Sequence, residues 1–426
     1  MTDLDKTQAY KKLLTQKQKK ISATLKQTLS SHHITHSDLE FNFGAALINP
    51  TCLKLLNELA VEQSVFQKFE SMINKKIINQ SEQKAVRHLE CRDLNSTEKI
   101  AKETLKTLNF SDKIRKESHR FTDILQIGIG GSHLGPHLLY QSLCAHYKPA
   151  FKSHFLSNCD THYNRQLLNS IDLEKTLIII SSKSGTTVET LHNYKLVSET
   201  AKKQKITAKK LRANTLTISE PNSPLHKLGS QEFYIFPEIG GRFSLTSPIG
   251  TLLLSCTFGK KVTKELLSGA HTMDKECRYT NYKKNAALVS ALLDIWNHSL
   301  LNYSSKAIIP YSTYLDLLPN YTQQLFCESN GKQVNQAGEP ISYPTSPIIY
   351  GSIGSNCQHA YFQLLHQSNT TSPIQFIGIK KSHTTKNTEL NTQLASQISA
   401  LSNGKKSNNK NNYFPGWHQQ VSVSQI

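Results

Sequence analysis

The sequence predicts an α/β protein in which a helical N-terminal region precedes two units built on parallel sheets. Apolar segments that run into turns of glycine or hydroxyl residues recur along the middle of the chain, and helical patterns separate them. A second set of such segments follows after residue 280. Strands that alternate with helices are typical of parallel sheets covered on both faces. A chain of 426 residues is long enough to bury two or three such cores.

Residues 1–115 are expected to form the helical region. LINPTCLKLLNELAVEQ (47–63) and SEQKAVRHLECRDL (81–94) carry apolar residues at helical spacing, and no strand pattern of comparable strength accompanies them. The short charged segment 115–120 marks the boundary with the next domain.

The first α/β domain is expected over residues 116–280. FTDILQIGIGG (121–131) predicts a buried strand that enters a glycine turn, and a helical pattern begins at Ser132. KTLIIISS (175–182) predicts a second strand, and QEFYIFPEIGGRFS (231–244) predicts a third that also ends in a glycine turn.

The second α/β domain is expected over residues 281–426. A helical pattern, NAALVSALLDIWNHSLLNY (285–303), precedes three predicted strands. These strands are KAIIPYS (306–312), PIIYGSIGS (347–355) and SPIQFIGIK (372–380).

Composition narrows the class of protein. Hydrophobic residues make up 37% and charged residues 19%, as expected of a globular chain. No apolar run approaches the roughly 20 residues that a membrane-spanning helix requires, and MTDLDKTQAYKKLL at the N-terminus has no apolar signal core. We therefore expect a cytoplasmic protein with no membrane partner. The eight cysteines form no CxxC pair, so we expect free thiols and no metal site.

The formal net charge of +19 has two explanations. A basic surface attracts nucleic acid or collects anionic substrates. The charge also follows from composition alone, because lysine is abundant along the whole chain. No basic stretch carries interleaved aromatic residues or a nucleic-acid-binding module, so no nucleic-acid partner is expected.

The turn SSKSGTT (181–187) lies between a predicted buried strand and a predicted helix. Free N–H groups, short hydroxyl donors and the positive end of a helix together favour an anion. An ordinary turn with a threonine cap would have the same composition, so the turn alone leaves both interpretations open.

Two further turns contain adjacent glycines. GIGGSHLGP (128–136) lacks the third glycine of a dinucleotide site, because His133 stands in its place, but it allows a ligand close to the backbone. GGRFSLTSPIG (240–250) presents Arg242 directly after two glycines, which suits a carboxylate, a phosphate or a developing oxyanion. An arginine in a surface salt bridge is the alternative.

Two segments of the second domain carry candidate acid–base groups. QQLFCESNGK (323–332) contains Glu328, which could act as a general base or simply end a helix before Gly331. YGSIGSNCQHAYFQLLHQ (350–367) places His359 just inside a predicted helix, where a structural role is equally open.

Taken in order, these five motifs resemble the phosphoglucose isomerase family. MINKKIINQSEQKAVRH (72–88) also resembles the N-terminal segment of that family, and the resemblance extends from about residue 40 to about residue 405. It implies two sugar-isomerase (SIS-type) α/β sandwich domains and interconversion of glucose 6-phosphate and fructose 6-phosphate, without a metal or an organic cofactor. It also implies a homodimer.

The resemblance assigns a role to each motif residue. Glu328 would move the proton between C1 and C2, Arg242 would stabilise the enediolate, and His359 would open the sugar ring from the neighbouring subunit. The residues implied to bind substrate are Ser182, Lys183, Ser184 and Thr187 at the phosphate, Gly131 and Ser132 on the sugar side, and Gln324, which positions the sugar. For Lys183 an outward-pointing side chain stays open, because the hydroxyl and N–H groups of the turn could suffice.

The chain also departs from the family pattern. The family carries a further lysine near its C-terminus, in a motif like QWGVELGK, and no such motif is present. The second domain is therefore expected to be incomplete at its C-terminal end. This departure leaves an alternative function open, a catalytically impaired remnant that still binds sugar phosphates.

Overall fold

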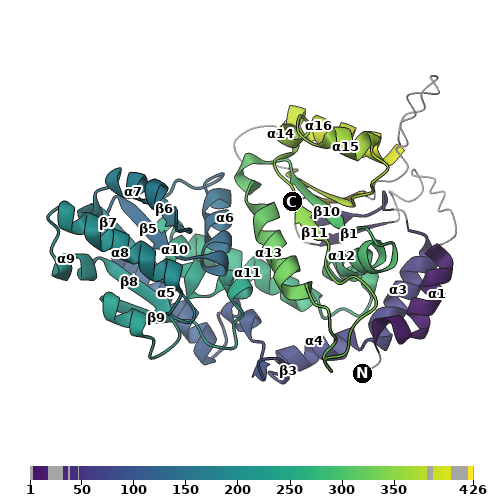
Figure 1. Cartoon of the computed structure of the whole chain (residues 1–426), viewed down its shortest axis with the longest axis horizontal. Coiled ribbons are helices and arrows are strands. Elements are labelled where there is room, and N and C mark those ends of the chain that lie inside the picture. The colour runs from purple at the N-terminus through teal and green to yellow at the C-terminus, as the bar shows by residue number, and fades with distance from the viewer. Residues whose placement is uncertain are drawn as a thin grey trace. The chain divides into compact units, whose positions relative to one another are not determined.

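The computed structural model describes residues 3–17, 32–36, 39–46, 48–380, 387–403 and 421–425. The chain divides into two compact units (Figure 1). The central unit is Ser71–Asp274, and the terminal unit combines Met1–Glu70 with Lys275–Ile426. The region of residues 1–115 is thus shared between the two units.

The central unit is built on a five-stranded sheet with the strand order β6-β5-β7-β8-β9. Every neighbouring pair in it is parallel. The strands are β5 (Asp123–Ile127), β6 (Lys152–Leu156), β7 (Thr176–Ser181), β8 (Thr215–Ser219) and β9 (Gln231–Tyr234). The three strands predicted from the sequence are confirmed as β5, β7 and β9.

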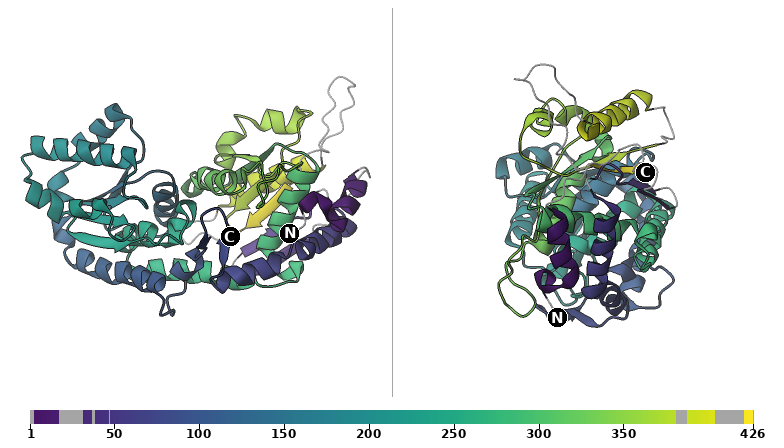
Figure 2. Two further views of the ribbon diagram at one scale, coloured as in Figure 1. Left: turned by 60° about the horizontal axis from the view of Figure 1, so that its bottom comes forward. Right: turned by 90° about the vertical axis from the view of Figure 1, so that its right-hand side faces the viewer.

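Helices cover both faces of the central sheet (Figure 2). On β7, Leu177 and Ile179 pack in a cluster with side chains of α5 and α10, whereas Ile178 and Ile180 pack on the opposite face with side chains of α8. This alternation explains the uninterrupted apolar run of β7. The helices of the unit are α5 (Lys99–Lys116), α6 (Leu134–Leu143), α7 (Thr161–Asn169), α8 (Val188–Lys203), α9 (Ala208–Ala213), α10 (Pro248–Phe258) and α11 (Lys260–Glu276).

The terminal unit contains a six-stranded sheet with the order β1-β2-β13-β12-β10-β11. Strands β10 to β13 pair in parallel, and the hairpin β1–β2 adds to β13 in the antiparallel direction. The strands are β1 (His33–His36), β2 (Leu39–Asn42), β10 (Ser305–Pro310), β11 (Ile348–Tyr350), β12 (Ile374–Gly378) and β13 (Val421–Gln425). The three strands predicted for the second domain are confirmed as β10, β11 and β12.

Helices α1, α3 and α12 share one hydrophobic core of the terminal unit. Helix α3 begins where the sequence favours it, because the Asn49 side chain accepts a hydrogen bond from the Cys52 N–H at 2.8 Å and Pro50 occupies the first turn. The helices are α1 (Gln8–Lys17), α3 (Pro50–Glu62), α4 (Val65–Ile73), α12 (Ala286–Asp294), α13 (Leu318–Asn330), α14 (Gly354–Cys357), α15 (Phe362–Gln367) and α16 (Thr388–Asn403).

The expectation of a purely helical region over 1–115 is wrong in two places. The hairpin β1–β2 was not visible in the sequence because strands of four residues give almost no period. The helix expected over 81–94 is replaced by β4 (Lys84–Ala85), which pairs with β3 (Ile77–Asn79), and by the short 3-10 turn η2 (His88–Cys91).

Within the described residues, no helix has the length and apolar character needed to cross a membrane. The eight cysteines are free thiols.

Candidate active site

The clearest cavity suited to an anion lies at the carboxyl end of the central sheet. It has a volume of about 330 Å³ and is lined by the turn after β5, the turn after β7 and three further residues, Thr190, Glu220 and Gly241. Ligands of open α/β sheets bind at this end of the strands. All six predicted substrate-binding residues of this unit belong to the first two turns and line the cavity: Gly131, Ser132, Ser182, Lys183, Ser184 and Thr187.

The turn after β7 is organised by its own hydroxyl groups. The Ser182 and Thr187 hydroxyl oxygens lie 2.8 Å apart, and the Gly185 N–H donates to the Ser182 hydroxyl at 3.1 Å. Gly185 has a φ of +70°, and a Cβ there would lie 1.8 Å from the Ser223 hydroxyl oxygen. Only glycine fits this position without displacing a neighbour. We call residues 182–187 the phosphate loop, after the role that the family resemblance predicts for them.

The Lys183 side chain binds to the backbone of the segment that follows β9. Its ammonium donates a hydrogen bond to the Pro237 carbonyl oxygen at 2.9 Å. Burial lowers the pKa of this ammonium, and the carboxylate of Glu220 opposes that effect. The side chain is therefore engaged within the fold.

The turns after β5 and β9 meet backbone to backbone. A Cβ at Gly131 would lie 2.1 Å from the Gly241 carbonyl oxygen, and the Ser244 hydroxyl donates to the Gly131 carbonyl at 3.2 Å. Gly241 opens the 3-10 helix η7 (Gly241–Thr246), which carries Arg242. The Arg242 guanidinium lies over the Phe243 ring, 5.0 Å from its centroid.

Residues 87–92 contact η7 and the segment that leads into it. The His88 and Phe243 rings stack with their centroids 4.7 Å apart and their planes inclined by 15°. The Arg87 N–H donates to the Glu238 carbonyl at 3.0 Å. The Arg92 Nε donates to the Thr246 hydroxyl at 3.4 Å. Sequence reasoning missed these residues, although the family-like segment 72–88 was the signal that could have located them.

The His88 imidazole is held neutral. Burial, and to a lesser extent the charge of Arg92, lower the pKa of His88 to about 3. Its Nδ1 is buried and has no hydrogen-bond partner among the described residues. A neutral ring adds no positive charge beside Arg242.

The remaining predicted residues, Gln324, Glu328 and His359, lie in the terminal unit. Gln324 and Glu328 are on α13, and the Glu328 side chain is exposed. The helix is tied to the sheet by the Gln323 side-chain amide, which donates to the Ile349 carbonyl at 2.7 Å. Gly331 ends the helix, as the sequence indicated.

A buried ion pair lies under the same helix. The Lys306 ammonium contacts both Asp294 carboxylate oxygens, at 2.7 and 2.9 Å, and lies 5.2 Å from the centroid of Phe326. Phe326 precedes Glu328 by two residues, so this contact helps to fix the rotation of α13.

His359 is exposed and does not lie inside a helix, which corrects the expectation. It occupies the bend between α14 and α15. At the start of this bend the Gln358 amide donates to the Tyr311 hydroxyl at 2.6 Å, and Gly354 leaves no room for a Cβ beside the Tyr311 ring. His366, by contrast, contacts the Gln397 side chain at 3.1 Å.

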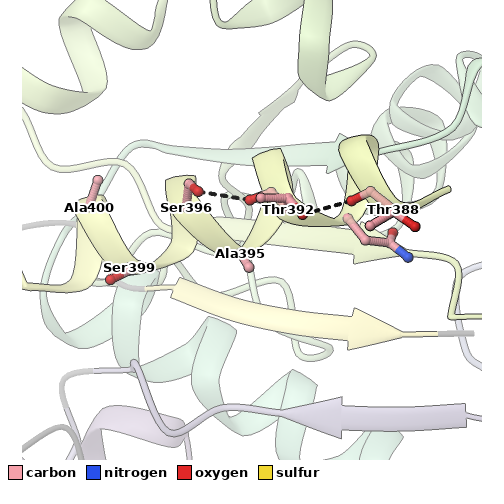
Figure 3. A pocket seen from close by; sticks show the side chains of 7 residues that line it. Thr388, Thr392, Ala395, Ser396, Ser399 and Ala400 are labelled. Carbon is pink, nitrogen blue, oxygen red and sulfur yellow. Dashed lines mark hydrogen bonds between the residues drawn. The ribbon is translucent and has the colours of Figure 1, made fainter.

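A second hollow, of about 840 Å³, runs along α16 (Figure 3). Small and neutral side chains line it, and the hydroxyls of Thr392 and Ser396 donate to carbonyls of their own helix, each at 2.8 Å. It offers no charged group to an anion. Among the described residues, no three His, Cys, Asp or Glu side chains are grouped so that they could hold a metal ion.

The comparison with known proteins is decisive for the family. The model of the phosphoglucose isomerase family matches residues 42–420. This chain belongs to the phosphoglucose isomerase family. The resemblance inferred from the five motifs is thereby confirmed.

Individual relatives agree with this assignment. A glucose-6-phosphate isomerase of Treponema denticola is 39% identical over 406 residues, which cover 89% of this chain and 77% of the relative. A glucose-6-phosphate isomerase of Borreliella afzelii is 35% identical over 430 residues, which cover 92% of this chain and 81% of the relative. The solved glucose-6-phosphate isomerase of Chlamydia trachomatis superposes with a TM-score of 0.94 at 29% identity, covering 100% of this chain and 87% of that one.

We predict that Gly131→Ala destabilises this phosphoglucose isomerase family member. The added methyl group collides with backbone, which cannot rotate away, so the free energy of unfolding should fall by about 1–3 kcal/mol. Chemical unfolding measures the change. Gly269→Ala is the matched control, because open space surrounds that glycine in α11. This substitution should raise the free energy of unfolding by about 0.5–1 kcal/mol. Equal stabilities for the Gly131→Ala variant and the wild type would contradict the close approach.

We predict that His88 makes the protein sensitive to mild acid. The pKa of His88 is about 3 when folded and 6.5 ordinarily, so the unfolded chain binds the extra proton between these values and stability falls as the pH drops below 6.5. From pH 7 to pH 5 this amounts to about 2 kcal/mol. His88→Phe keeps the stacking and should flatten the dependence of thermal unfolding on pH over this range. An equal pH dependence of thermal unfolding in the wild type and in His88→Phe would show that His88 takes up its proton in the folded protein.

Proposed function

We propose that this chain interconverts glucose 6-phosphate and fructose 6-phosphate. The observation that carries the proposal is the cavity at the carboxyl end of the central sheet, where the phosphate loop faces the Gly131 turn and the Gly241 turn. Membership of the phosphoglucose isomerase family supports the choice of substrate.

The phosphate would be held by the phosphate loop and by the N-terminus of α8. This helix has 16 residues and begins at Val188, directly after the loop, so its unpaired N–H groups and its dipole favour an anion there. Hydroxyl groups of Ser182, Ser184 and Thr187 supply further donors. Each hydrogen bond to a charged group contributes roughly 1.5–3 kcal/mol. Gly131 and Ser132 would lie beside the sugar.

Glu328 would act as the base. In the open aldose it removes the proton from C2, and the O1 and O2 atoms share the negative charge of the resulting enediolate. Return of the proton to C1, with a proton moving from O2 to O1, gives the ketose. Positioned acid–base groups supply about 10² to 10⁴ in rate. Gln324, one helical turn before Glu328, would position the sugar.

Arg242 would stabilise the enediolate, because a guanidinium aimed at developing charge lowers the barrier without accepting a proton. It needs no metal or organic cofactor for this. His359 would open the sugar ring by moving a proton to or from the ring oxygen.

We further propose a homodimer in which His359 serves the active site of the partner subunit. The support is its exposed position in the bend between α14 and α15, together with the family resemblance. A cytoplasmic location stays a prediction from the sequence.

We predict that Glu328→Gln lowers kcat for fructose 6-phosphate by at least about 10²-fold and leaves KM within a few-fold, because the amide cannot accept the proton. A coupled assay for glucose 6-phosphate measures it. Glu389→Gln is the control, an exposed glutamate on α16 whose replacement should leave kcat unchanged. A folded wild type that binds sugar phosphate without turnover would instead favour the impaired remnant.

We predict that inactive Glu328→Gln and His359→Ala chains complement each other. If His359 acts across the interface, each mixed dimer has one site with both wild-type groups, so random re-pairing restores about a quarter of the wild-type activity. The measurement is activity after the two variants are mixed under conditions that allow exchange. Mixed dimers without activity would place both groups in the same subunit.

A further inference from the structure

Lys183 is half-buried and its side chain leaves the phosphate loop. The ammonium lies 2.9 Å from the Pro237 carbonyl oxygen, in the segment that leads from β9 to η7. The carboxylates whose charges reach this ammonium are Glu220, Glu82 and Glu238. The negative charges of these carboxylates offset part of the positive charge of the ammonium, so it would attract a phosphate less strongly.

The segment that accepts this hydrogen bond, residues 237–239, is also held by contacts with other parts of the unit. The Glu238 carbonyl accepts from the Arg87 N–H at 3.0 Å, and the Glu238 carboxylate lies 3.0 Å from the Lys99 ammonium. The Ile239 side chain is completely buried. Gly240, Gly241 and Arg242 follow without any intervening residue. A shift of the segment would therefore move Arg242.

The backbone of Lys183 is anchored as well. Its carbonyl accepts from the Glu220 N–H at 3.0 Å and from the Ser219 hydroxyl at 3.2 Å. The residue thus links the phosphate loop and the end of β8 to the segment before η7.

We propose that Lys183 is a positioning residue that ties the phosphate loop to Pro237–Ile239 and thereby sets the turn that carries Arg242. This inference rests on the proposed function for its catalytic consequence. The phosphate itself is held by the N–H and hydroxyl groups of the loop. In this proposal the Lys183 side chain takes the outward course that the sequence left open, and it links the phosphate loop to the turn that carries Arg242.

The test compares Lys183→Met, which removes the donor, with Lys183→Arg, which keeps a donor of similar reach. Loss of one hydrogen bond from a charged donor should lower kcat for fructose 6-phosphate by about 10-fold in Lys183→Met, with KM within about 3-fold, and Lys183→Arg should restore most of the rate. Lys227→Met is the control for the lost charge, because Lys227 is exposed in the same unit. Lys183→Gln, which is too short to reach Pro237, replaces Lys183→Met if that variant does not fold.

A second readout does not depend on turnover. Amide hydrogen exchange of a peptide covering residues 236–246 is measured with and without saturating inorganic phosphate. In the wild type and in Lys183→Arg, phosphate should slow exchange over 238–243. In Lys183→Met, exchange should be faster and insensitive to phosphate.

The outcomes separate this inference from the proposed function. A KM raised at least about 10-fold in Lys183→Met with kcat unchanged would identify a phosphate ligand and overturn the inference. Equal exchange in the wild type and in Lys183→Met, or no effect of phosphate on the wild type, would overturn it too. A wild type without turnover that still shows the expected exchange pattern would refute the proposed function and leave the link in place.

Discussion

The candidate site depends on the direct backbone contact between the turns that follow β5 and β9. A Cβ atom at Gly131 would lie 2.1 Å from the Gly241 carbonyl oxygen, so the turn after β5 must stay free of a side chain at this point. The contact fixes where Ser132 and Arg242 lie relative to each other. The phosphate loop joins them from β7, which pairs directly with β5 in the sheet. Sheet pairing and one glycine contact thus bring three distant segments to one cavity.

Support for this arrangement comes from residues that do not line the cavity. His88 stacks on Phe243, and Arg87 hydrogen bonds to the Glu238 backbone, so a segment near residue 90 holds η7 in place. Groups behind a site often determine how accurately it is held, since the reacting groups are only as well placed as their neighbours. The Lys306–Asp294 pair beneath α13 has the same relation to Glu328 in the terminal unit.

The sequence predicted the parallel sheets and the loops at their strand ends because both have local signals. The run Leu177 to Ile180 is apolar throughout, and SSKSGTT is a dense group of donors next to it. The β1–β2 hairpin and the bend at His359 had no such signal, and the sequence left the direction of the Lys183 side chain open. The hairpin and the lysine each have a partner far along the chain: β13 for the hairpin and Pro237 for the lysine. Tertiary contacts of this kind override local pattern.

The hydrogen bonds within the phosphate loop have a consequence for ligand exchange. The Ser182 hydroxyl contacts Thr187 and accepts from the Gly185 N–H. If a phosphate binds here as proposed, it replaces these bonds, so its net gain is smaller than the number of new contacts suggests. When such a ligand leaves, the Ser182 hydroxyl can form the same two bonds again. The loop is therefore suited to a ligand that must depart as readily as it binds.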